Sequence, residues 1–222
     1  MDMKKSVFLA VLMIVLTVFV SAFAEPYTLH AGVQFGMTAD EVIEKENARG
    51  NTFEMIDGRL INTSKISIVD MNATIYFDFD SEGKLIRQQY RFRDQVFDSI
   101  RNKFETVYGL PECSSASDTK LALPSYFKSF SGPMPTADEF GKTIINNSMV
   151  SYSYSGLTYC QWMVEVEEGF VVIEQYGRSL NAKVGNKSSG AVANLCFVDY
   201  NLFTKEEILG AINENASKYD DL

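Results

Sequence analysis

The chain is poor in the side chains on which many enzymes and metal centres depend. Its 222 residues hold one histidine, His30, one tryptophan, Trp162, and three cysteines. A Ser-His-Asp or Cys-His catalytic site would need His30, and no nucleophile turn lies near it in the sequence. Zinc sites take several closely spaced Cys and His ligands, which this chain does not offer. The sequence therefore predicts no enzymatic activity, no cofactor and no metal site.

Positive charge is also scarce. Lys and Arg number 20 against 29 Asp and Glu, which gives a net charge of −9. An acidic surface repels the phosphates of nucleic acids and of anionic membranes. We expect a soluble protein with no nucleic-acid partner.

Long hydrophobic runs are limited to one, Val7 to Val20. Lys4 and Lys5 precede it and Ser21-Ala22-Phe23-Ala24 follows it, which is the order of parts in a secretory signal. At 1.5 Å per residue the run reaches about 21 Å, short of the ~30 Å hydrocarbon core of a bilayer. Residues 1–24 are predicted to be a signal peptide, and no cysteine follows that could carry a lipid. We expect a secreted or extracytoplasmic protein with no stable membrane anchor after cleavage.

The cysteines are Cys113, Cys160 and Cys196. In an oxidising compartment two of them could pair. Cys160 and Cys196 both lie in strand-like runs, so they are the predicted disulfide. The alternative is that all three are small buried apolar residues.

The remaining sequence alternates between helix and strand patterns. Capping patterns predict helices over 39–48 and from residue 204, and apolar spacing predicts another from about 96 to 108. Strands are predicted at 53–56, 60–61, 66–69, 73–79, 86–92, 149–154, 159–166, 170–176 and 192–200, with a long connection at 111–148 and a loop at 185–190. Period-two burial indicates an antiparallel sheet with one wet side. Arg87, Gln89 and Arg91 are expected to be solvated on that side.

Two motifs resemble a known family. Gly36-Met37-Thr38-x-Asp40-Glu41-Val42 and Ile75-Tyr76-Phe77-x-Phe79-Asp80-x-x-Gly83-x-Leu85 are similar to the repeat of the SmpA/OmlA-type outer-membrane-assembly lipoproteins of bacteria and of the β-lactamase-inhibitor-protein-like fold. The resemblance implies an α+β fold of two tandem lobes, each with short helices packed on a curved antiparallel sheet. The lobes would span residues 25–93 and 94–222, with 111–148 as an inserted loop. Known members of this family bind other proteins.

A run rich in tyrosine and serine is the predicted binding site. Tyr152, Tyr154 and Tyr159 precede Trp162, and rigid rings separated by small residues are typical of protein-binding surfaces. The alternative is that these rings face the core. The sequence thus favours an exported soluble module that binds an unidentified protein or cell-envelope component through an exposed face of its sheet. Glycan or small-ligand binding is the second hypothesis, and an unrecognised hydrolase the third.

Overall fold

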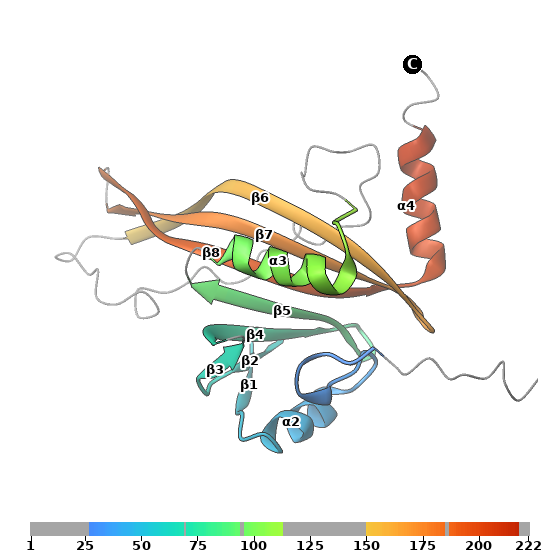
Figure 1. Cartoon of the computed structure of the whole chain (residues 1–222). Coiled ribbons are helices and arrows are strands. Elements are labelled where there is room, and N and C mark those ends of the chain that lie inside the picture. The colour runs from blue at the N-terminus through green and yellow to red at the C-terminus, as the bar shows by residue number, and fades with distance from the viewer. Residues whose placement is uncertain (1–26, 69, 94–95, 113–149, 185–186, 218–222) are drawn as a thin grey trace, which may run out of the picture.

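The computed structural model describes residues 27–68, 70–93, 96–112, 150–184 and 187–217. The first half of the chain is mostly strand (Figure 1). Its elements are η1 (His30–Gly32), α2 (Ala39–Asn47), β1 (Phe53–Ile56), β2 (Arg59–Asn62), β3 (Ile66–Ile68), β4 (Met71–Phe79) and β5 (Leu85–Arg93). Thr38 and Glu41 form the predicted capping box of α2, with each side chain bonded to the other's backbone N–H.

The second half follows the same order of helix then strands. It contains α3 (Phe97–Tyr108), β6 (Val150–Val166), β7 (Gly169–Val184), β8 (Lys187–Phe203) and α4 (Lys205–Ser217). None of the helices in the described part of the chain is both long and apolar enough to cross a membrane. Residues 94 and 95, directly before α3, lie outside the described residues.

All eight strands belong to one antiparallel sheet in the order β1-β2-β4-β5-β8-β7-β6, with β3 paired to β4. The two halves of the chain meet where β5 pairs with β8, from Arg87↔Asn201 to Arg93↔Leu195. The α+β class with an antiparallel sheet is confirmed. The expected arrangement of two lobes is not confirmed, since a single sheet runs through both halves.

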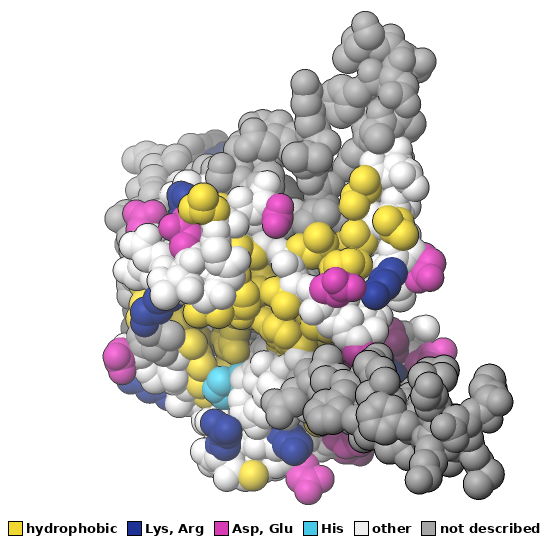
Figure 2. Space-filling view, turned by 45° about the vertical axis from the view of Figure 1, so that its right-hand side comes forward, with side chains coloured by type: hydrophobic (Ala, Val, Ile, Leu, Met, Phe, Trp, Pro, Cys, Tyr) yellow, Lys and Arg dark blue, Asp and Glu magenta, His cyan; other side chains and the backbone are white. Residues whose placement is uncertain are grey.

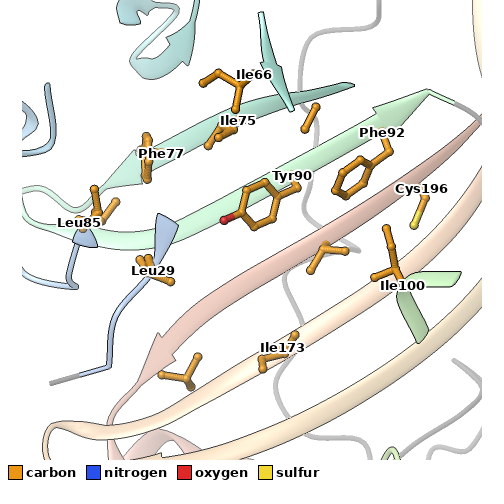
Figure 3. Close-up of a cluster of buried hydrophobic side chains, with 14 of the residues drawn as sticks. Leu29, Ile66, Ile75, Phe77, Leu85, Tyr90, Phe92, Ile100, Ile173 and Cys196 are labelled. Carbon is orange, nitrogen blue, oxygen red and sulfur yellow. The ribbon is translucent and has the colours of Figure 1, made fainter. Parts of the chain in front are cut away.

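Helices α2 and α3 lie on the same side of this sheet. Val42 of α2 and Ile100 of α3 belong to one buried cluster, which also holds Trp162. Figure 3 shows side chains of several strands turned toward this side, among them Ile75, Tyr90 and Ile173. Partly buried rings, including Tyr27, Phe35, Phe104, Tyr108 and Tyr200, pack against the cluster. Hydrophobic side chains gather across the middle of the surface seen in Figure 2.

The opposite side of the sheet has far less apolar packing among the described residues. There Ile208 of α4 packs with Val172 and Phe203 at one end of β7 and β8. The rest of this side carries polar side chains at alternate strand positions, together with buried rings such as Phe197, which stacks on Tyr176.

Two strand boundaries differ from the prediction. β6 is one strand from Val150 to Val166, and a register shift between Ser155 and Thr158 takes up the Gly-Leu pair that the sequence suggested as a break. β8 already begins at Lys187, inside the predicted loop 185–190. Both differences come from pairing with β7, which supplies backbone partners regardless of local propensity.

Candidate functional site: a buried polar row across the sheet

Five polar residues from five neighbouring strands lie opposite one another in a single row. Their register runs from β4 through β5, β8 and β7 to β6: Tyr76, Gln89, Asp199, Glu174 and Gln161. At about 4.8 Å between strands, this polar row spans roughly 19 Å. All five residues are buried. Burying polar groups is costly unless they find partners, so the row is the most unusual feature of the fold.

Asp199 is the best-connected residue of the polar row. Its carboxylate accepts hydrogen bonds from Arg87 Nη2 at 2.6 Å and from Gln89 Nε2 at 2.6 Å. The Tyr176 hydroxyl donates a third bond at 3.3 Å. Loss of water by burial raises the pKa of Asp199, although the Arg87 charge works in the opposite direction.

A chain of alternating charges leads from Asp199 toward the first half of the protein. Arg87 also donates a hydrogen bond to Asp78 at 3.3 Å. Asp78 in turn accepts two hydrogen bonds from the Arg59 guanidinium, one at each carboxylate oxygen. Burial lowers the pKa of Arg87 because it disfavours the charged guanidinium. The negative charges of Asp199 and Asp78 outweigh this effect, and the pKa of Arg87 is raised overall. The guanidinium of Arg59 lies 4.5 Å from the centre of the Tyr76 ring. These charges therefore stabilise one another across β2, β4, β5 and β8.

Glu174 organises the other half of the polar row. It accepts a hydrogen bond from the Tyr159 hydroxyl at 2.8 Å and another from Asn201 Nδ2 at 3.3 Å. Glu174 and Asp199 are direct cross-strand neighbours, and like charges in that position repel. Each is instead held by its own set of donors.

Among the described residues, amide oxygens beside the two carboxylates are buried without a hydrogen-bond partner. They include Gln89 Oε1 and Asn201 Oδ1. Both amides turn their NH₂ groups to a carboxylate, which leaves the oxygens as unused acceptors. An unsatisfied buried acceptor costs about 1 to 3 kcal/mol. Both oxygens are closed off from solvent, so a donor could reach them only by entering the interior of the site.

The predicted aromatic binding patch does not form one surface. Tyr159 and Trp162 are both buried, and they point to opposite sides of the sheet. Tyr159 faces Glu174, whereas Trp162 donates to Gly109 O at 3.0 Å and contacts the Phe104 ring. Tyr152 and Tyr154 lie in β6, but their side chains are outside what the structure describes.

The predicted Cys160–Cys196 disulfide is wrong in this structure. Both thiols are free and buried. Cys160 of β6 lies opposite Gln175, and Cys196 of β8 lies opposite Gly177, so β7 separates them. Two strand spacings place their Cα atoms roughly 10 Å apart or more, beyond the reach of a disulfide. Cys113 lies outside the described residues.

The expectation that Arg87, Gln89 and Arg91 are solvated is also wrong, since all three are buried. Apart from Tyr159, which was predicted as a binding residue, Glu174, Tyr176, Asp199 and Asn201 were not singled out from the sequence. Their signal is the polar residues at alternate positions of β7 and β8, Glu174 and Tyr176 in one strand and Asp199 and Asn201 in the other. That pattern looks like an ordinary wet face until the pairing of β5 with β8 is known.

His30 has a role away from this site. Its Nδ1 lies 2.8 Å from the buried Glu46 carboxylate, which also accepts a bond from Asn51 at 2.7 Å. These contacts tie η1 to α2 and to the turn that follows α2. Among the residues that the structure describes, no three His, Cys, Asp or Glu side chains cluster closely enough to hold a metal ion.

Comparisons with known proteins find no relative of this chain. A scan against protein-family models finds no match for the chain, and searches of curated proteins and of solved structures find none.

Proposed function

We propose that this chain is an exported binding module whose polar row recognises a hydrogen-bonding ligand, with sugars or other polyols of the cell envelope as the leading class. The observation that carries the proposal is the polar row itself, five buried polar residues crossing five strands. A purely structural sheet face gains little from such a row, since apolar residues of similar volume are often as stable or more stable than buried ion pairs.

The chemistry of the row favours a neutral ligand over an anion. The carboxylates of Asp78 and Asp199 are paired with the guanidinium groups of Arg59 and Arg87, so the described residues of the site offer no free cation to an anion. Gln89 Oε1 and Asn201 Oδ1 are acceptors that hydroxyl groups could satisfy. The rings of Tyr76, Tyr159 and Tyr176 lie on the same side of the sheet, and such rings pack well against sugar faces.

A thermal-shift experiment tests the proposal on the mature chain. The probes are chitooligosaccharides and soluble peptidoglycan fragments at low concentration, where a compound that binds the folded state raises the melting temperature and the general stabilisation that concentrated polyols give by exclusion from the protein surface is negligible. Asp199→Asn keeps the shape of the side chain and removes its charge, and Asp98→Asn makes the same change at an exposed position of α3. We expect a shift for the parent and for Asp98→Asn that is lost in Asp199→Asn. An equal shift in both variants, or no shift with any sugar probe, contradicts the proposal.

Protein binding is a second candidate, favoured by exposed apolar side chains on two helices. Val107 and Leu110 at the end of α3 are 70% and 80% exposed, and Leu209 and Ile212 of α4 are also exposed. Val107→Asp with Leu110→Asp should abolish capture of a protein partner from a cell-envelope extract if α3 is the docking site. Trp162 is unsuited to such a test, because replacing a buried ring destabilises the fold.

A further inference from the structure

The outer edge of the sheet at β6 differs from the edge at β1. β6 is the last strand in the sheet order, and Figure 1 shows it as the outermost strand on its side. It is 17 residues long, whereas β1 at the other edge has four residues, one of them Glu54. Exposed strand edges invite pairing with other chains, and proteins usually shorten them or protect them with charge or proline. The β1 edge is protected in this way.

The β6 edge lacks these protections. From Val150 to Val164 its sequence contains no Asp, Glu, Lys, Arg or Pro. Among the described residues, one backbone bond reaches its outer side, from Glu112 N to Gln161 O at 2.8 Å. That bond lies in the second half of the strand. The first part of the strand, Val150 to Ser155, pairs with β7 on its inner side.

This part of β6 also extends beyond the end of β5. β5 pairs with β8 only over Leu195 to Asn201, while β7 and β8 continue pairing as far as Val184↔Lys187. The β6, β7 and β8 segments beyond that point form a three-stranded arm (Figure 1). On the outer side of this arm, no backbone group of Val150–Ser155 is hydrogen-bonded to the backbone of another described residue.

We propose that Val150–Ser155 pairs in antiparallel register with the same segment of a second copy of this chain, forming a two-fold symmetric dimer. The occupant is argued from charge. The chain carries a net charge of −9, so copies repel one another over most surfaces. In this segment no register of self-pairing places like charges opposite each other.

Symmetry supplies a second argument. Rotation about a two-fold axis perpendicular to the sheet leaves each residue on its own face of the sheet. Two residues that pair across the axis therefore face the same side, which means that their numbers are both even or both odd. Serine and tyrosine alternate from Ser151 to Ser155. Tyrosine positions therefore oppose tyrosine positions, and serine opposes serine, and both kinds of cross-strand pair are favourable.

Sedimentation velocity across a dilution series tests the dimer on the mature chain. We expect a monomer–dimer equilibrium that shifts toward dimer at higher salt, because salt screens the net negative charge. Ser153→Lys brings two positive charges together near the axis and should weaken the dimer by roughly tenfold or more. Ser67→Lys is the matched control, since it makes the same change at an exposed position of β3, near the other edge. It should leave the dimer intact.

Hydrogen exchange keeps the test decisive if Ser153→Lys folds poorly. In the parent chain, amide protection of Val150–Ser155 should rise with protein concentration. A chain that is monomeric at every concentration, or protection that is independent of concentration, overturns the proposal; the latter would mean that the chain covers its own edge. Assemblies larger than a dimer also overturn it, because two-fold pairing of this edge closes on itself.

Discussion

At the scale of single residues, Arg87 is the side chain on which the polar row depends most. It bonds Asp199 at 2.6 Å and Asp78 at 3.3 Å while being buried itself. Arg87→Met would leave Asp199 buried without its cation, and breaking a buried pair in this way costs about 3 to 5 kcal/mol. Urea unfolding measures the loss. Arg101→Met removes a surface pair with Glu105 and should cost less than about 1 kcal/mol; similar costs for the two variants would contradict the assigned role of Arg87.

The loss in Arg87→Met should depend on pH. Burial raises the pKa of Asp199 in the folded protein, so the folded state binds a proton more readily than the unfolded state. The contribution of Asp199 to the free energy of unfolding is therefore greatest at low pH, and it falls as the pH rises through the pKa that Asp199 has in the folded state. Removing Arg87 takes away an effect that lowers this pKa, so the deficit of the variant should shrink on acidification. Unfolding curves at mildly acidic and at neutral pH decide the sign, and a deficit that grows in acid would be contrary to this account.

The two buried thiols should be inert in the folded protein. Burial raises the pKa of Cys196 to about 12, so at neutral pH it stays protonated, and only the thiolate reacts with alkylating agents. Iodoacetamide labelling followed by peptide mass spectrometry should leave Cys160 and Cys196 unmodified in native protein and modify both in urea. A peptide that links the two residues, or fast labelling of Cys196, would show that the thiols are not placed as described.

At the scale of elements, the turn between β6 and β7 depends on Gly169. Its φ is +150°, and a Cβ there would lie 2.1 Å from the Phe203 backbone oxygen. Gly169→Ala should therefore destabilise the protein by roughly 2 kcal/mol or more. A Cβ added at Gly210 in α4 would meet no atom within 4 Å, so Gly210→Ala should stabilise by about 0.5 to 1 kcal/mol through helix propensity. Melting temperatures that move in the same direction for both variants would contradict this reasoning.

Helix starts were predictable because their signals are local. The Thr38–Glu41 and Thr204–Glu207 capping boxes are confirmed, with the Thr204 N–H donating to Glu207 at 2.7 Å. The alternation in β4 and β5 also predicted two strands at the right places. The polar row was not predictable, because it exists only when β5, β8, β7 and β6 are in register, and nothing local in the sequence specifies which strand ends up beside β5.

At the scale of the whole molecule, the two halves share their core. Ile75 and Phe92 of the first half belong to the same buried cluster as Trp162 and Val198 of the second half. Tyr27 links them again on the helix side, where its hydroxyl lies 3.0 Å from the hydroxyl of Tyr108 in α3. Neither half buries its apolar surface without the other.

The protein should therefore unfold in one step. Trp162, the only tryptophan, reports on the second half through fluorescence, and far-ultraviolet circular dichroism reports on all elements. For a two-state transition both signals give the same midpoint. Phe92→Ala, at the junction between β5 and β8, should cost about 3 to 5 kcal/mol and shift both midpoints together, since it weakens the core that the halves share. Hydrogen exchange of β4 amides should show the same opening free energy as that of β7 amides. A Trp162 transition displaced from the circular dichroism transition, or a Phe92→Ala effect confined to one of them, would mean that the halves are separate folding units joined by a weak seam at β5 and β8.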